Sequence, residues 1–146
     1  YQNVISNLHI LDYDYYFKIT DDLMASNSSS VLLVFDEILK KGFDEHNFIL
    51  GLTEHFRNLI MARNEDTISL LDATEKLSET YKAQALESDP SFLMTALHLG
   101  NQCDLNFKSA KNQRLHVEVT LMKMAHIPHL LNGEALEEAS KKKVLS

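Results

Sequence analysis

"VLLVFDEILKKGFDEHNFILGLTEHFRNLIMAR", residues 31–63, decides the fold class of this chain. Its apolar side chains recur every three or four residues, at Val31, Val34, Phe35 and Ile38 and then at Phe48, Leu52 and Leu59. That spacing places them on one face of a helix. Gly42 suits the left-handed position past a helix end, and Asp44 can cap the helix that follows. The stretch therefore predicts two amphipathic helices, about residues 31–41 and 45–63, joined by a tight corner.

Similar signals of helix ends recur along the rest of the chain. They predict helices over residues 13–26 after Asp12, 74–87, 90–104 after Asp89-Pro90, and 113–127 between Asn112 and Pro128, with a short turn from Asp66 or Thr67 to about residue 71. Four glycines and two prolines are too few for the turns of a many-stranded fold. We expect an all-α fold, an irregular bundle of about six helices in residues 1–131, followed by a polar tail or linker in residues 132–146.

Length and charge restrict the classes of protein. The 146 residues suit one domain with its own core, and the start without Met suggests a fragment of a longer protein. The net charge of −7 disfavours direct DNA binding, which needs a surplus of Lys and Arg. The single Cys103 excludes an internal disulfide and fits a reducing cytoplasm. No apolar run approaches the roughly 18 residues of a membrane span, so we expect no membrane contact.

We expect no catalytic, cofactor-binding or metal site. The sequence contains no Gly-x-x-x-x-Gly-Lys phosphate loop. His126 and His129 are close in sequence, but Pro128 is expected to spoil the helical register that would make them converge. Cys103 could act as a nucleophile with a histidine brought near by folding, although a small buried thiol is the more common role.

Glu118 is an unusual feature of the helix predicted over residues 113–127. Leu115, Leu121, Met122 and Ala125 share one apolar face, and Glu118 falls in its middle. Glu118 could point to solvent or make a weak surface pair with Arg114, one turn earlier. We favour a buried ion pair with Arg57 or His55 that locks this helix against the helix over residues 45–63. A third alternative is that Glu118 reaches a neighbouring chain.

Four aromatic side chains crowd the first predicted helix. Tyr13, Tyr15, Tyr16 and Phe17 fall on more than one of its faces. A helix that is apolar all round is either buried or faces a partner, and tyrosine suits interfaces because it keeps one polar end. These residues are therefore candidates for an interface, with a core helix carrying tyrosines at its rim as the alternative.

Three stretches together resemble a known family. They are "LDYDYYFKITDDLM" (residues 11–24), "LLVFDEILKKGFDEHNFILGLTEHFRNLIMAR" (residues 32–63) and "LNFKSAKNQRLHVEVTLMKMAHI" (residues 105–127). Their order is similar to the third domain of the gamma/tau subunit of bacterial DNA polymerase III, the ATPase subunit of the clamp loader. The resemblance covers about residues 4–127 and implies a collar-like helical bundle.

The resemblance also implies a function and partners. In that family, collars of five subunits form a ring that holds the AAA+ ATPase modules, so this fragment would be an oligomerisation collar without enzymatic activity. Its partners would be other gamma/tau copies and the delta and delta-prime subunits. The sliding clamp and primer–template DNA, as well as ATP, Mg²⁺ and zinc, would be bound only by domains outside this fragment. The alternative is a helical adaptor that binds a partner helix or peptide and is unrelated to replication.

Overall fold

The computed structural model describes residues 12–145, without the side chains of residues 134–140 and 142–145. Its helices are α2 (Tyr13–Met24), α3 (Ser28–Lys40), α4 (Glu45–Ala62), α5 (Glu65–Ile68), α6 (Glu75–Glu87), α7 (Pro90–Leu105) and α8 (Gln113–Leu145). The part of the chain that the structure describes contains seven helices and no strand. The predicted all-α fold is therefore confirmed.

Local capping chemistry accounts for most helix starts. The side chains of Asp12, Asp44 and Asp89 each accept a hydrogen bond from a backbone N–H two or three residues further on. Gly42 follows α3 with a φ of 97°, in the left-handed region. Two helices start earlier than predicted, because asparagines cap them: Asn27 precedes α3 and Asn64 precedes α5.

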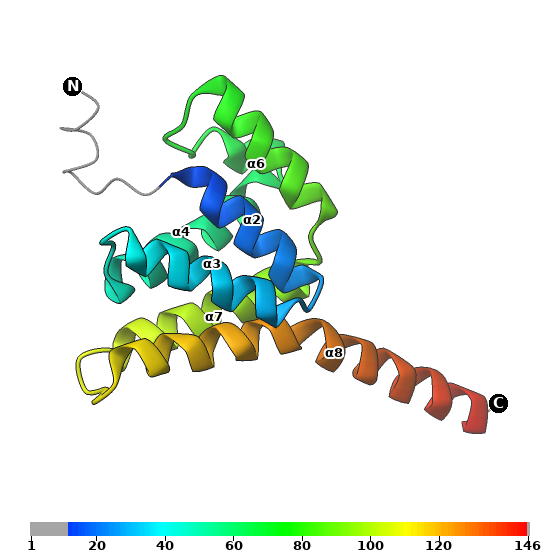
Figure 1. Cartoon of the computed structure of the whole chain (residues 1–146). Coiled ribbons are helices and arrows are strands. Elements are labelled where there is room, and N and C mark those ends of the chain that lie inside the picture. Colours follow the sequence, from blue (N-terminus) through cyan, green and yellow to red (C-terminus); the bar gives the residue numbers. More distant parts are fainter. Residues whose placement is uncertain (1–11, 146) are drawn as a thin grey trace.

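The helices form two layers with α6 above them. In Figure 1, α2, α3 and α8 lie in front of α4 and α7. The core between the layers is aromatic and aliphatic, and its largest fully buried side chains include Phe35, Phe48, Phe56, Ile19, Leu52 and Leu121. The α4 and α7 helices approach closely, since a Cβ atom at Gly100 would lie 2.3 Å from Oγ1 of Thr53.

The last helix differs from the prediction. We expected Pro128 to end it, but α8 continues through Pro128 to Leu145. Proline removes one backbone hydrogen bond, yet Ile127 is buried before it and Leu131 packs against the core after it, so packing on both sides holds the helical path. Beyond the bundle α8 projects away from the other helices (Figure 1), and nothing lies within 4 Å of a Cβ atom placed at Gly133.

Candidate interaction surfaces

Two of the four aromatic residues of α2 belong to the bundle interior. Tyr16 is only 8% exposed and stacks on Phe48 with ring centroids 6.1 Å apart. Its ring lies so close to α4 that a Cβ atom at Gly51 would be 2.0 Å from the tyrosine oxygen. Phe17 is partly buried, and the ring of His55 meets it edge to face at 4.6 Å. Tyr16 is thus a core residue of the bundle, as in the alternative of a core helix, and an interface role for it stays an untested prediction.

The other two aromatic residues lie nearer the surface. The Tyr15 hydroxyl donates to Glu37 at 3.4 Å and accepts from the ammonium group of Lys41, which also lies 4.9 Å from the centre of the Tyr15 ring. Tyr13 is 53% exposed. A contact between Tyr13, Tyr15 or Phe17 and another chain stays a prediction.

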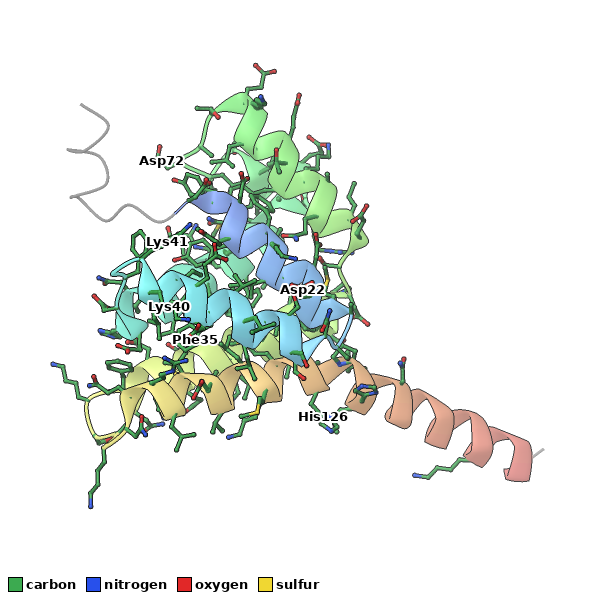
Figure 2. All side chains as sticks on the ribbon, viewed as in Figure 1. Asp22, Phe35, Lys40, Lys41, Asp72 and His126 are labelled. Atoms are coloured by element: carbon green, nitrogen blue, oxygen red, sulfur yellow. The ribbon has the colours of Figure 1, made fainter. Side chains whose placement is uncertain are left out.

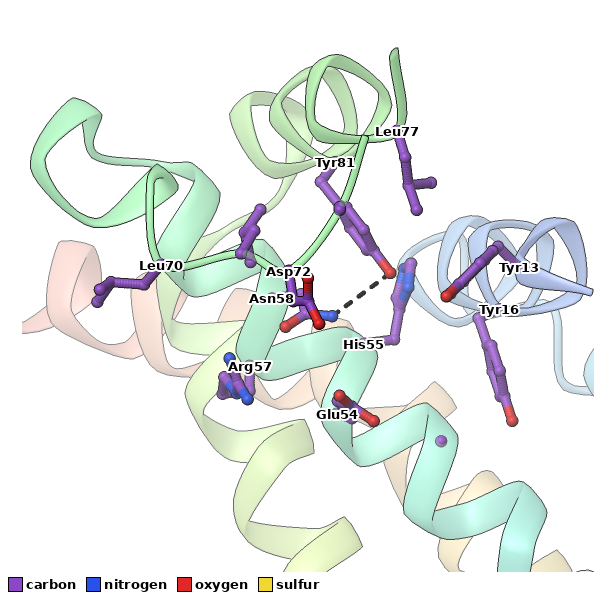
Figure 3. A pocket seen from close by; sticks show the side chains of 13 residues that line it. Tyr13, Tyr16, Glu54, His55, Arg57, Asn58, Leu70, Asp72, Leu77 and Tyr81 are labelled. Carbon is purple, nitrogen blue, oxygen red and sulfur yellow. Dashed lines mark hydrogen bonds between the residues drawn. The ribbon is translucent and has the colours of Figure 1, made fainter. Parts of the chain in front are cut away.

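Tyr13 borders a hollow of about 170 Å³ between α2, α4 and the segment that leads into α6. Figure 3 shows this hollow, with the Tyr81 hydroxyl accepting a hydrogen bond of 3.4 Å from the amide of Asn58. The charged groups on its lining are Glu54, Arg57 and Asp72, and none of them forms an ion pair with another described residue. The hollow is polar and has no nucleophile paired with a base.

Beside this hollow, a buried polar network joins α4, α6 and α2. The amide nitrogen of Gln84 donates to the backbone oxygen of Phe17 at 2.8 Å and to Asp21 at 2.9 Å. The Gln84 oxygen must therefore accept from Nε2–H of His55, at 2.7 Å. Burial lowers the pKa of His55 to about 4, against a smaller opposite effect of the Gln84 hydrogen bond. His55 is thus a neutral core residue whose Nδ1 has no partner among the described residues.

Glu118 does not form the buried pair that we favoured. Its side chain is 28% exposed and accepts a hydrogen bond of 3.4 Å from Arg114, which was the surface alternative. Arg57 is exposed on α4 and donates instead to the sulfur of Met61 at 3.2 Å. Since His55 is neutral and bonded to α6, neither predicted cation reaches Glu118. The prediction of a buried Glu118 pair with Arg57 or His55 is therefore wrong.

Arg114 nevertheless connects α8 to another helix. It pairs with Asp36 of α3 at 2.9 Å, and Asp36 also pairs with Lys40 at 2.9 Å. Hydrogen bonds from Lys40 and Arg114 lower the pKa of Asp36, and the bond to Asp36 raises the pKa of Arg114. The ion pairs between α3 and α8 therefore form a solvent-exposed network, and the sequence had not indicated Asp36 as a partner.

The apolar face predicted around Glu118 is divided in the structure. Leu121 and Ala125 are buried, whereas Leu115 and Met122 are exposed together with Val119. Because α8 is apolar on two sides, Glu118 lies at the border between a buried stripe and an exposed one. We call Leu115, Val119 and Met122 the α8 surface.

A second exposed apolar region lies on the other layer. Its exposed members are Leu50 of α4 and Met94 and Leu105 of α7, and the partly buried Leu97 of α7 completes it. A hollow of about 320 Å³ between these helices has mostly polar residues in its lining. It is lined by Leu50 and Leu97 together with Thr53, Glu54, Arg57, Asn101 and Asp104. We call these four apolar residues the α4–α7 surface. We had not predicted the α4–α7 surface from the sequence, although Met94, Leu97 and Leu105 share a face of α7 at helical spacing.

The groups considered for catalysis do not converge. Cys103 is buried, and burial raises the pKa of its thiol, which disfavours the reactive thiolate. The nearby His116 donates from Nε2 to the backbone oxygen of Cys103 at 2.9 Å. Among the side chains that the structure describes, no group of three or more His, Cys, Asp and Glu is arranged to hold a metal ion.

A comparison with protein families shows which family this chain belongs to. Residues 4–138 match the family described as DNA polymerase III subunits gamma and tau domain III. The chain belongs to this family. The gamma/tau resemblance seen in the three sequence stretches is thereby confirmed, and the match extends past residue 127 into the projecting part of α8. A search of curated proteins finds no match to this gamma/tau domain III. None of the described helices is both long and apolar enough to cross a membrane.

Proposed function

We propose that this gamma/tau domain III is an oligomerisation collar, which holds clamp-loader subunits in a ring. The observation that carries the proposal is the pair of separate exposed apolar regions, the α8 surface and the α4–α7 surface. They lie on different layers of the bundle (Figure 1) and remain exposed after the core has formed. Contiguous exposed apolar patches mark sites where proteins associate.

Two different surfaces suit a ring better than a symmetric dimer. A symmetric dimer uses the same patch on both chains, whereas a ring pairs one patch with a different patch of the next subunit. The α8 surface of one collar would pack against the α4–α7 surface of its neighbour. The neighbours would be other gamma/tau copies, delta or delta-prime, in the cytoplasm where replication takes place.

The role of such a collar is mechanical. Linked binding modules keep one another at high effective concentration, so a stable collar would keep the ATPase modules together while their own contacts form and break. We propose that the domain has no enzymatic activity and no cofactor of its own. ATP, Mg²⁺, zinc, the sliding clamp and primer–template DNA would be bound by other parts of the subunit.

The test is to disrupt each surface separately in the full-length subunit. Leu115→Glu with Val119→Glu damages the α8 surface, and Leu50→Glu with Met94→Glu damages the α4–α7 surface. Each double variant should be monomeric by native mass spectrometry under conditions where the unmodified subunit associates. An equimolar mixture of the two should form dimers that grow no further, since one intact pair of surfaces remains. Leu86→Glu, at an exposed position of α6 outside both surfaces, is the control and should associate normally.

Two outcomes would contradict the proposal. Unchanged association of both double variants would show that neither surface is used. Association lost only in the α4–α7 variant would favour the alternative function, an adaptor that binds one partner helix or peptide through that surface.

A further inference from the structure

Continuation of α8 through Pro128 brings together two histidines that we had expected not to converge, and places a methionine beside them. Met122, His126 and His129 stand at positions i, i+4 and i+7 of one uninterrupted helix. At 3.6 residues per turn they lie within about 60° of one another around the helix axis. All three line one hollow of about 260 Å³, which Ser26 and Ser28 border from the turn between α2 and α3. Figure 2 places His126 on α8 below that turn.

The two imidazoles are close enough to share a ligand. Their ring centroids are 5.6 Å apart with an angle of 39° between the planes. Both rings are exposed, and neither makes a hydrogen bond or an ion pair with another described residue. Metal-bound imidazole nitrogens lie about 2 Å from the ion, and exposed rings can turn toward a common ion without disturbing the core.

We propose that Met122, His126 and His129 form a binding site for a soft monovalent metal ion, Cu(I) or its analogue Ag(I). The donor atoms of these three side chains favour this class of ion. Imidazole nitrogen binds several transition metals, whereas thioether sulfur selects soft ions such as Cu(I). A bound ion would lie between α8 and the turn that joins α2 to α3, at the place where α8 leaves the bundle.

The chain supplies its own matched control. Met94 and His98 repeat the spacing of Met122 and His126 on α7, and both are exposed, but residue 101 is asparagine where α8 has His129. A pair of ligands without the third should bind the ion more weakly. The five methionines can be followed separately by their ¹³C-labelled methyl groups.

The experiment is an anaerobic Cu(I) titration against a chromophoric chelator, with methionine methyl spectra recorded in parallel. We expect one tight site, with the Met122 methyl shifting before the Met94 methyl. His126→Ala, His129→Ala and Met122→Leu should each weaken Cu(I) binding at least about tenfold, a scale at which even the outer partners of metal ligands act. His98→Ala and Cys103→Ala should leave the affinity unchanged, and Met122→Leu should leave Zn²⁺ binding unchanged.

Several results would overturn the proposal. Equal weakening in His98→Ala, loss of binding in Cys103→Ala, or no effect of Met122→Leu on Cu(I) would each contradict the assigned site. The proposal does not depend on the collar function, although Met122 belongs to the α8 surface. Leu115→Glu, which should impair association, is expected to leave Cu(I) binding intact, so the two proposals can fail separately.

Discussion

His55 lies on the inner face of α4 with 2% of its surface exposed and with one hydrogen bond, to Gln84. In an unfolded chain its imidazole would bind a proton near the ordinary pKa of about 6.5. In the folded chain the pKa is about 4, because burial disfavours the charged ring. The folded state therefore binds fewer protons than the unfolded state between these two values.

This difference predicts a pH dependence of stability. The free energy of unfolding should fall as the pH drops from about 6.5 to 4, by about 3 kcal/mol from His55 alone. Denaturant unfolding of the wild type and His55→Gln over this range measures it, since the variant lacks the titrating group and should show a shallower slope. His98→Gln, at an exposed position of α7, should keep the wild-type slope. Equal slopes for the wild type and His55→Gln would contradict the assignment.

Glu118, unlike His55, should contribute little to the stability of the domain. Its pair with Arg114 is long and partly exposed, and such surface pairs contribute little. Glu118→Gln should change the free energy of unfolding by less than about 0.5 kcal/mol. Urea denaturation of both proteins at neutral pH measures this change in the free energy of unfolding. A loss above about 2 kcal/mol would indicate a buried partner that the structure does not contain.

At the scale of elements, the contact between α4 and α7 depends on one small residue. Gly100 faces Thr53, whose hydroxyl is held by a hydrogen bond of 2.7 Å to the backbone oxygen of Ile49. A methyl group at position 100 would force the helices apart or break that bond. The absence of a side chain at Gly100 thus lets α4 and α7 approach this closely.

Gly100→Ala should therefore destabilise the domain by about 1–3 kcal/mol, the usual cost of overpacking, although alanine favours helix by about 1 kcal/mol. Adding Thr53→Ala should restore part of the loss, which a double-mutant cycle by thermal or urea unfolding would measure. Gly133→Ala is the matched control, because a Cβ atom there meets nothing within 4 Å, and it should not destabilise. A stabilising effect of Gly100→Ala would contradict the close approach.

For the whole molecule, the projection of α8 separates a packed part from an unpacked part. The bundle contacts of α8 include the buried Met124 and Ile127, whereas Gly133 has open space around it. The continuous helix does not mark the boundary that we predicted near residue 131. The domain boundary near residue 131 therefore stays a prediction, which depends on where packing ends and not on a break in the helix.

A chain that stops after Asn132 should keep the stability of the bundle. Because α8 projects away from the other helices here (Figure 1) and Gly133 has open space around it, we expect the free energy of unfolding to change by less than about 0.5 kcal/mol, as for surface changes. Far-UV circular dichroism should show a loss of helix without an earlier unfolding transition. Removing Leu131 as well should destabilise, because Leu131 packs against the core.

The sequence by itself determined the helices and their order. The caps Asp12, Asp44 and Asp89 and the corner at Gly42 act within a few residues, so local chemistry is enough to place them. The family resemblance could also be read from the residues. These features need no information about how the helices meet.

Only the tertiary structure decided which sides of the helices are buried. The α8 helix carries two apolar stripes, and its packing against the neighbouring helices buries Leu121 while leaving Leu115 in solvent. The path through Pro128 and the proximity of His126 to His129 also depend on that packing. Helical periodicity predicts which residues share a face, but burial is decided by residues distant in sequence, so the partners of Glu118 and the two exposed surfaces could not be predicted from local spacing.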